Sequence, residues 1–359
     1  MKVCGIPYRS IWREEDRLVI IDQTRLPFEF KTPPLTDVES AAHAIRSMQV
    51  RGAPLIGATA AFGIALAMSA DASDASLKDA ATLLAGTRPT AVNLRWAIDR
   101  MLSHIEPLAS GKRAGAAWDR AQAIADEDIA LNTAIGGYGL DLLKRIAEKK
   151  GHVNVLTHCN AGWLATVDVG TALAPIYVAH DAGIPVHVWV DETRPRNQGL
   201  LTSWELTQHG VPNTLIVDNA GGHLMQRGEV DIVIVGADRV SAQGDVCNKI
   251  GTYLKALAAN DCGVPFYAAV PTPTLDWDIV DALKEIPIEE RSAAEVLSMR
   301  GIDNGQLVPG FAIAPAGTRA ANPAFDVTPA RLVTGLITDR GIAPATHSGM
   351  RELFQRKVA

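Results

Sequence analysis

From residue 153 onward the sequence alternates between short runs of β-forming residues and segments long enough to form helices. The β-rich runs are Val153–Leu156, Pro185–Val190, Thr214–Val217, Asp231–Val235 and Pro265–Val270. The segments of helical length between them are Gly170–Ala182, Thr202–Gln208, Ala220–Gln226 and Lys249–Ala259. Strands that alternate with helices form βαβ units, and almost continuously apolar strands are typical of a parallel sheet covered on both faces. The sequence therefore predicts an α/β fold with a doubly wound, Rossmann-like domain.

The earlier part of the chain is predicted to be mostly helical. A small sheet is expected near its start, formed by Arg17–Asp22 with its neighbour Leu26–Phe30. Thr36 and Glu39 have the spacing of a capping box in front of an amphipathic run, which indicates a helix start. This part is therefore expected to be a helical region with a few strands.

A linker is expected near Glu148–His152, which divides the chain into an N-terminal α+β domain (residues 1–148) and a catalytic domain (residues 149–359). Within the first domain, Pro54–Ala70 is a run of 17 residues without a charge. A membrane-spanning helix needs roughly 20 strongly apolar residues, and this run is shorter and rich in alanine and glycine. We expect a buried helix that begins at Arg51-Gly52-Ala53-Pro54, because proline is favoured in the first turn of a helix.

Charge and cysteine usage narrow the class of protein. The net charge of −6 and the pI of about 5.9 argue against nucleic acid or an acidic membrane as the main partner. The first residues show no signal-peptide pattern. The four cysteines form no C-x-x-C, and no histidine pair with zinc spacing lies near them. We expect a cytoplasmic protein with reduced thiols and without a structural zinc ion.

Polar residues follow the predicted strands one after another. Cys159 follows the first strand, an amide-rich loop with Gln198 follows the second, and Asp238 follows the fourth. Ligands of open parallel sheets bind beyond the carboxyl ends of the strands, so Cys159 is a functional candidate as well as a candidate for core filler. Arg51 and Arg88 each stand just outside a predicted helix start, where a cation and free backbone N–H groups hold phosphate. The alternative for either arginine is a solvated side chain at an ordinary helix start.

Motifs for nucleotide binding and serine catalysis are missing. No G-x-G-x-x-G follows the first strand, and neither a P-loop nor a G-x-S-x-G elbow occurs in the sequence. A thiol, a carboxylate, an amide-rich loop, a lysine and remote arginines remain. This inventory suits acid–base chemistry on a phosphorylated small molecule without a cofactor.

Seven motifs resemble those of the methylthioribose-1-phosphate isomerases, a group within the initiation factor 2B α/β/δ-like family. The motifs, in order, are RGAPLIG at Arg51, RPTAVNL at Arg88, THCNAG at Thr157, ETRPRNQG at Glu192, GADRV at Gly236, GDVCNKIGTY at Gly244 and NPAFDVTP at Asn322. The resemblance extends from about Arg9 to Gly341. Cys247 stands where alanine is common in the family, and Asp339 where glutamate is common. Neither is a presumed catalytic position.

The resemblance implies a role for each matched residue. Asp238 matches the family's proton donor, and Cys159 matches its second catalytic residue. The implied substrate contacts are Arg51, Gly52, Ala53, Arg88, Gln198, Asn248 and Lys249. The implied fold is a smaller N-terminal domain of helices and antiparallel strands on a Rossmann-like domain. A homodimer that needs no metal or organic cofactor is expected.

The implied reaction converts 5-methylthioribose 1-phosphate to 5-methylthioribulose 1-phosphate in methionine salvage. A buried Asp238 with a raised pKa would suit protonation of the ring oxygen. Hydrogen then moves from C2 to C1, either through an enediol with Cys159 or Asp238 as base, or as a hydride shift. Lys249, which we expect at a helix start, suits phosphate but could also be a solvated helix residue. His158 is expected to be a core histidine bonded to backbone.

Two other functions stay open. One is a sister isomerase that acts on 5-deoxyribose 1-phosphate or ribose 1,5-bisphosphate, and the walls around the C5 group would distinguish it. The other is a non-catalytic regulatory subunit like those of initiation factor 2B, which has no need of an acid–base pair.

Overall fold

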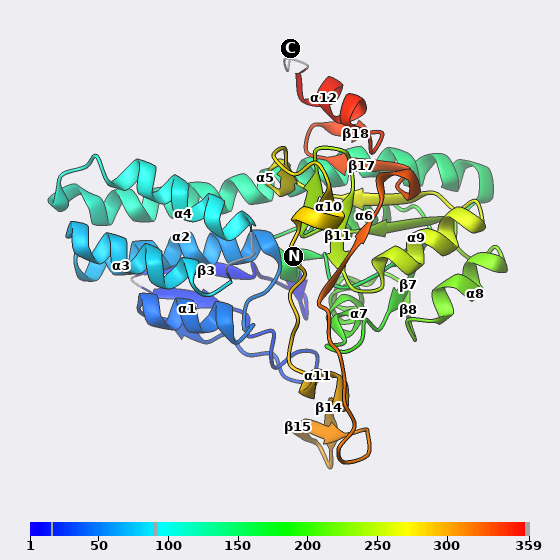
Figure 1. Cartoon of the computed structure of the whole chain (residues 1–359), viewed down its shortest axis with the longest axis horizontal. Helices are drawn as coiled ribbons and strands as arrows, with labels where there is room; N and C mark the ends of the chain where they lie inside the picture. The colour runs from blue at the N-terminus through cyan, green and yellow to red at the C-terminus, as the bar shows by residue number, and fades with distance from the viewer. Residues whose placement is uncertain (16, 89–91, 356–359) are drawn as a thin grey trace.

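The computed structural model describes residues 1–15, 17–88 and 92–355. Its N-terminal part contains short antiparallel strands and helices α1 to α5. Figure 1 shows α1 to α4 at one end of the molecule, with the long helix α5 running from there across the rest. The elements are β1 (Lys2–Val3), β2 (Ile6–Pro7), β3 (Ile11–Glu14), β4 (Arg17–Ile20), β5 (Pro34–Leu35), α1 (Val38–Arg46), α2 (Ala53–Ala70), α3 (Asp74–Ala85), α4 (Val92–Ile105) and α5 (Ser110–Lys150).

The uncharged run forms helix α2, which begins where the sequence predicts. Gly52 is its N-cap residue, and Pro54 lies in its first turn. By length and composition α2 could cross a membrane, but 78% of it is buried inside the protein. It packs against α4 and α5 in the core of the N-terminal part. The expected helix start at Pro89-Thr90 lies outside the described residues.

Two predictions about local structure are wrong. Strand β4 pairs with β3 on one side and with β5 on the other, whereas Leu26–Phe30 forms no strand. Helix α1 is capped by Asp37 instead of Thr36, because the Asp37 carboxylate accepts from the backbone N–H of Ser40 and Ser40 reciprocates. Aspartate is as good a capping residue as threonine, so spacing alone could not decide between them.

The C-terminal part is built on a seven-stranded sheet in the order β18-β17-β12-β9-β6-β7-β8. Its strands are parallel except for the antiparallel pair of β17 and β18. These strands are β6 (Val153–Thr157), β7 (Val186–Asp191), β8 (Asn213–Ile216), β9 (Ile232–Val235), β12 (Phe266–Ala269), β17 (Gly335–Thr338) and β18 (Gly341–Ala343). The five predicted strands are therefore confirmed, and so is the α/β fold class.

Alternate residues of the sheet enter two separate cores, as a doubly covered sheet requires. Val155 and Ile234 belong to a cluster with residues of α5 and α6, whereas Leu156 and Val235 belong to a cluster with residues of α8 and α9. The covering helices are α6 (Ala174–Asp181), α7 (Gln198–His209), α8 (Ala220–Gln226) and α9 (Thr252–Asp261). Long helix α5 also packs against α2 and α4, so it contacts both parts of the molecule. The division at residue 148 stays a prediction.

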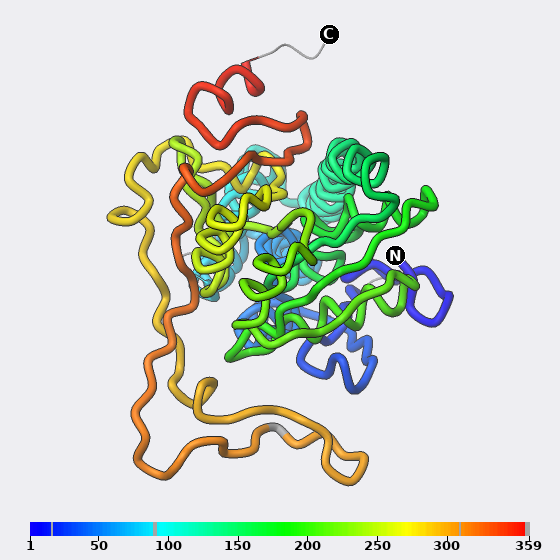
Figure 2. Tube along the Cα trace, turned by 90° about the vertical axis from the view of Figure 1, so that its right-hand side faces the viewer, coloured from blue at the N-terminus to red at the C-terminus, as the bar shows by residue number. Residues whose placement is uncertain are grey.

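Beside the large sheet lies a four-stranded sheet in the order β13-β10-β11-β16. Its strands are β10 (Arg239–Ser241), β11 (Val246–Lys249), β13 (Leu275–Asp276) and β16 (Phe325–Thr328). Between β13 and β16 the chain leaves the body as an arm that carries the hairpin of β14 and β15 (Figure 2). The remaining elements are η1 (Trp163–Ala165), η2 (Thr272–Thr274), α10 (Ala282–Glu285), α11 (Ala294–Leu297), β14 (Ser298–Asp303), β15 (Gln306–Ala312), η3 (Ala330–Leu332) and α12 (His347–Gln355).

Candidate active site

The strand order creates a crevice between β6 and β9. From β6 the chain moves outward through β7 and β8, then returns to β9 on the other side of β6 and continues outward to β12. Loops that follow β6 and β9 therefore diverge, and such switch points are where open α/β sheets bind ligands. Cys159 lies two residues beyond β6, and Asp238 lies three residues beyond β9.

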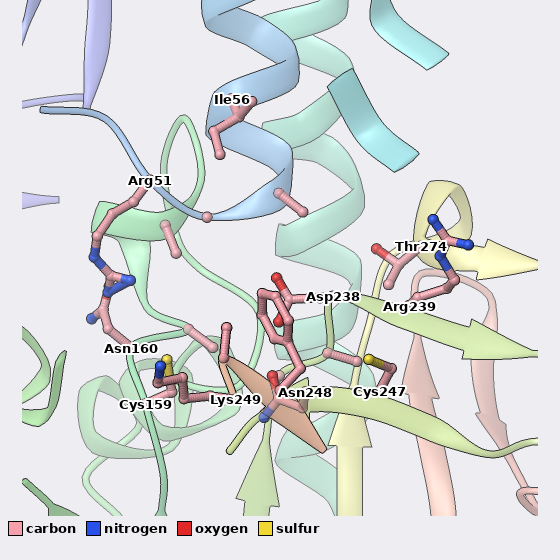
Figure 3. Close-up of a pocket in the computed structure, with 18 of the residues that line it drawn as sticks. Arg51, Ile56, Cys159, Asn160, Asp238, Arg239, Cys247, Asn248, Lys249 and Thr274 are labelled. Atoms are coloured by element: carbon pink, nitrogen blue, oxygen red, sulfur yellow. The ribbon is translucent and has the colours of Figure 1, made fainter. Parts of the chain in front are cut away.

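A cavity of about 140 Å³ occupies this crevice. It also reaches the start of α2 and strand β11 (Figure 3). All nine residues singled out from the sequence line it: Arg51, Gly52, Ala53, Arg88, Cys159, Gln198, Asp238, Asn248 and Lys249. The tertiary structure thus brings together two candidate catalytic groups and every candidate substrate contact.

Asp238 and Cys159 are both shifted towards their protonated forms. Burial raises the pKa of the Asp238 carboxyl, although Arg88, Lys249 and Arg51 oppose the shift. Burial also raises the pKa of the Cys159 thiol, and Arg51 and Lys249 again oppose it. A carboxyl group with a raised pKa is suited to donate a proton, which is the role that the resemblance implies for Asp238.

Arg51 is prepared to hold an anion. Its Nε and Nη2 atoms are buried and have no hydrogen-bond partner among the described residues. The adjacent start of α2 has no side-chain cap, so its first N–H groups and the positive end of the helix dipole are directed to the same region. A guanidinium with two buried, unpaired nitrogen atoms next to an uncapped helix start is suited to a phosphate group.

Lys249 lies elsewhere in the secondary structure than predicted. It is the last residue of strand β11, not the first residue of a helix, and α9 begins at Thr252. Its side chain is buried, and no described carboxylate lies within 4.0 Å of its ammonium group. Burial lowers the pKa of Lys249, and Cys159 and Asp238 oppose the shift. The neighbouring Asn248 donates from Nδ2 to Thr252 Oγ1 at 3.0 Å.

The other two predicted contacts come from different segments. Arg88 Nη2 lies 3.3 Å from Glu289 Oε2, so it is tied to the base of the arm. Gln198 begins helix α7, and its Oε1 atom is buried without a partner among the described residues. An unpartnered amide oxygen facing the cavity can accept a hydrogen bond from a sugar hydroxyl.

Several residues that line the cavity were not predicted from the sequence. Asn160 and Arg196 lie inside recognised motifs, so their position next to Cys159 and Gln198 could have revealed them. Glu289 and Arg291 precede the arm, and no local pattern marks them. Arg291 pairs with Glu289 at 2.8 Å and Arg196 with Glu295 at 2.6 Å. These paired arginines belong to the cavity wall, whereas Arg51 and Lys249 are available to a ligand.

The cavity brings together a carboxyl group with a raised pKa, a thiol and two available cations. These groups can protonate a bound phosphate ester and move hydrogen within it. The closest approach to a metal-type cluster among the described residues is His158, Asp191 and Asp218. The Lys255 ammonium already lies 3.2 Å from the Asp191 carboxylate in this cluster. The same ammonium group also bonds to the carbonyl oxygen of Asp218 at 2.6 Å.

Comparisons with known proteins agree with this geometry. The Initiation factor 2 subunit family matches residues 49–345. A methylthioribose-1-phosphate isomerase of Gluconobacter oxydans is 61% identical, over 100% of this chain and 99% of its own. One from Rhodospirillum rubrum is 60% identical, over 100% of this chain and 94% of its own.

Solved structures show the same fold. The crystal structure of 5-methylthioribose 1-phosphate isomerase from Pyrococcus horikoshii has a TM-score of 0.86 and 41% identity, covering 97% of this chain and 96% of its own. A structure described as the delta subunit of translation initiation factor eIF-2B from A. fulgidus has a TM-score of 0.82 and 40% identity, covering 98% of this chain and 100% of its own. With relatives about 60% identical over its full length, the chain belongs to the methylthioribose-1-phosphate isomerases of the initiation factor 2 subunit family.

Proposed function

We propose that the chain interconverts 5-methylthioribose 1-phosphate and 5-methylthioribulose 1-phosphate. The observation that carries the proposal is the meeting of Asp238, whose pKa burial raises, with Cys159 in one cavity that also holds the unpaired Arg51 guanidinium. The names of the relatives identify the substrate.

One set of residues binds the substrate, and another transfers protons. Arg51, Lys249 and the start of α2 hold the phosphate on O1. Protonated Asp238 gives its proton to the ring oxygen as the bond from that oxygen to C1 breaks. The hydrogen on C2 then moves to C1, and the C2 hydroxyl becomes the ketone as it returns a proton to Asp238. The overall reaction is therefore neutral in protons and electrons.

Two routes for the hydrogen remain, and they use Cys159 differently. In the enediol route a thiolate takes the proton from C2 and returns it to C1. Arg51 and Lys249 favour that thiolate, while burial disfavours it. In the hydride route Cys159 only shapes a dry pocket around C1 and C2. Solvent deuterium at C1 of the product, after turnover in D₂O, supports the enediol route.

Turnover of a panel of sugar phosphates tests the proposal. We expect the 5-methylthio compound to outrank 5-deoxyribose 1-phosphate and ribose 1,5-bisphosphate. Cys159→Ala and Asp238→Asn should each lose about 100-fold or more in kcat while the protein stays folded. Cys262→Ala is the matched control, because Cys262 caps the end of α9 and does not line the cavity.

The same assay addresses a regulatory role, which the description of the A. fulgidus neighbour brings into view. A wild-type chain that turns over none of the sugar phosphates, and that instead binds a GTPase, would replace the isomerase proposal. Near-normal kcat in Cys159→Ala or Asp238→Asn would remove that residue from catalysis.

We also propose that two copies associate. Leu215, Val217 and Leu254 are exposed by 41%, 59% and 61%. Leu215 lies on β8, the edge strand of the large sheet, and Lys255 Nζ bonds to the carbonyl oxygen of Asp218 next to Val217. Exposed apolar side chains near the edge of the large sheet are suited to contact with a second copy. Sedimentation of wild type and Leu254→Asp tests this, with a dimer expected only for the wild type.

A further inference from the structure

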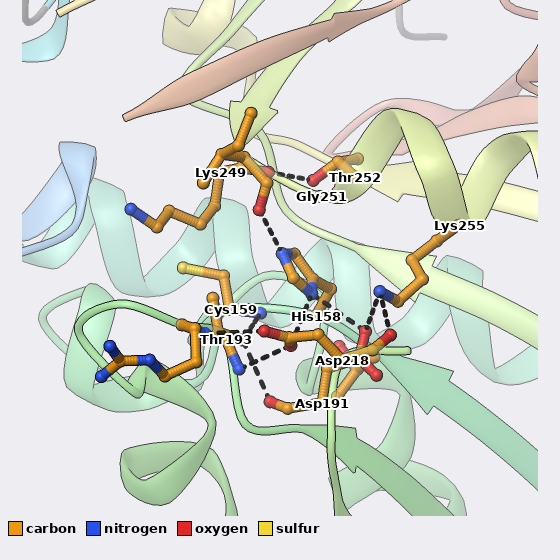
Figure 4. A network of polar contacts seen from close by, with 12 residues as sticks. His158, Cys159, Asp191, Thr193, Asp218, Lys249, Gly251, Thr252 and Lys255 are labelled. Carbon is orange, nitrogen blue, oxygen red and sulfur yellow. Dashed lines mark hydrogen bonds and ion pairs between the residues drawn. The ribbon is translucent and has the colours of Figure 1, made fainter. Parts of the chain in front are cut away.

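The backbone of Cys159 has a conformation that few cysteines adopt. Its φ angle is 69°, in the left-handed region, where residues other than glycine persist only if their surroundings hold them. Figures 3 and 4 both show the Cys159 sulfur on the side of Lys249. The conformation of this one residue therefore decides whether the thiol is directed into the cavity.

Thr193 holds the peptide group on the N-terminal side of Cys159. Its side chain is fully buried. The hydroxyl donates to the carbonyl oxygen of Asp191 at 3.0 Å and accepts from the backbone N–H of Cys159 at 2.9 Å. Because the hydroxyl has one proton, donation to Asp191 leaves its lone pairs for the cysteine.

Thr202 holds the peptide group on the C-terminal side. It too is fully buried, and its hydroxyl donates to the carbonyl oxygen of Cys159 at 2.8 Å. The same hydroxyl accepts from Asn160 Nδ2 at 3.1 Å. Each threonine hydroxyl thus both donates and accepts, so neither is free to rotate.

The Thr193 side of this arrangement rests on a buried network of charges (Figure 4). Asp218 accepts from the backbone N–H of Thr193 at 2.8 Å. Asp191 lies 2.9 Å from His158 Nδ1 and 3.2 Å from Lys255 Nζ. The other nitrogen of His158 lies 2.8 Å from the carbonyl oxygen of Ile250, so the predicted core histidine bonds to backbone and to a carboxylate. This network fixes the loop that presents Thr193.

We propose that Thr193 and Thr202 are positioning residues that hold the left-handed backbone of Cys159 and so direct its thiol between Arg51 and Lys249. Neither threonine lines the cavity, so both act through the cysteine. The kinetic part of the test rests on the proposed isomerase activity. The chemical part, the reactivity of the thiol, does not.

Isosteric substitutions separate the hydroxyl from the shape of the side chain. Thr193→Val and Thr202→Val remove the bonds to Cys159, whereas Thr193→Ser and Thr202→Ser keep them. We expect kcat to fall by about 10- to 100-fold in the valine variants with KM changed little, and the serine variants to recover most of the rate. Thr157→Val is the matched control, because it loses a buried hydroxyl bond to the Ile234 carbonyl oxygen on the strand that leads to Cys159.

Alkylation of Cys159 by iodoacetamide, followed by mass spectrometry of its peptide, gives the second readout. The midpoint of the rate against pH should move up by about half a unit or more in the valine variants, because the thiolate leaves the two cations. A kcat equal to that of Thr157→Val, or an unchanged midpoint in folded variants, overturns the proposal. If Thr193→Val does not fold, the Thr202 pair decides. A fully active Cys159→Ala would exclude a catalytic role for the thiol. The alkylation result alone would then decide whether Thr193 and Thr202 position it.

Discussion

At the scale of single residues, the cavity is lined by ionisable groups whose charged forms are disfavoured by burial. The Arg51 guanidinium is the clearest case, because burial lowers its pKa and two of its nitrogens have no partner among the described residues. An unsatisfied buried cation destabilises the unliganded protein, and a bound phosphate relieves that cost. Affinity for the anion and stability of the empty protein are therefore opposed at this position.

Replacing Arg51 by methionine should separate the two effects. We expect the affinity for sugar phosphate to fall about 10- to 100-fold, because charge-assisted hydrogen bonds are lost. The unliganded variant should be more stable than the wild type, by about 1 kcal/mol or more. Calorimetric titration and urea unfolding measure these quantities.

Arg227→Met is the control for this experiment. Arg227 pairs with Glu229 on the surface, where its side chain is 61% exposed. Neither affinity nor stability should change by more than about 0.5 kcal/mol in this variant. An Arg51→Met protein that binds sugar phosphate as tightly as the wild type would exclude Arg51 from the anion site.

At the scale of elements, the start of α2 must approach the loop after β6 very closely. Gly52 has a φ angle of 89°, and a Cβ atom there would lie 2.6 Å from the Cα atom of Ala165. Glycine is needed for both the backbone conformation and the contact. The contact places Arg51 and the helix start on the same cavity as Cys159.

Gly52→Ala should therefore lower the free energy of unfolding by about 2–4 kcal/mol and weaken phosphate binding as well. Gly115→Ala is the matched change, because Gly115 is an exposed residue of α5 where a Cβ atom would meet no atom within 4 Å. That variant should be more stable by about 0.5–1 kcal/mol. Thermal unfolding of the two proteins checks the opposite signs, and equal stability of Gly52→Ala and wild type would contradict the close approach.

At the scale of the whole molecule, stability should depend on pH through two buried carboxyl groups. Burial raises the pKa of Glu205 to about 8, although bonds from the Leu164 N–H and from Asn160 oppose it. Burial raises the pKa of Asp128 to about 7. Over the interval between its ordinary and its raised pKa, each folded carboxyl keeps a proton that the unfolded chain has lost. Each group therefore makes the free energy of unfolding fall as pH rises.

Urea unfolding between pH 5 and pH 8.5 tests this dependence. Each group should contribute a decline of about 1.4 kcal/mol per pH unit within its own interval. Glu205→Gln should flatten the profile up to about pH 8, whereas Asp128→Asn should flatten it only up to about pH 7. A Glu205→Gln profile parallel to that of the wild type would mean that Glu205 is ionised in the folded protein.

Much of the molecule follows from local sequence. The five predicted strands of the large sheet form, as does the buried helix that follows Gly52, because short continuous apolar runs and an N-terminal proline act within a few residues. All nine predicted site residues line one cavity. Cys159, Gln198 and Asp238 meet there because they follow strands of one parallel sheet, whose carboxyl ends lie at one edge. Local sequence could not decide between two capping residues of similar preference, and the structure has Asp37 instead of Thr36 as the N-cap of α1.

Only the tertiary structure decided how these pieces meet. Two predicted strands, β7 and β8, stand in the sequence between the strands that precede Cys159 and Asp238, yet β6 and β9 are direct neighbours in the sheet. Local sequence predicted a helix start at Lys249, whereas Lys249 ends strand β11. No local pattern marks the segment that brings Glu289 and Arg291 to the cavity wall. Strand order and the course of an arm depend on packing between residues far apart in the chain. The sequence by itself determined the chemistry that is present, and long-range packing determined which groups face one another.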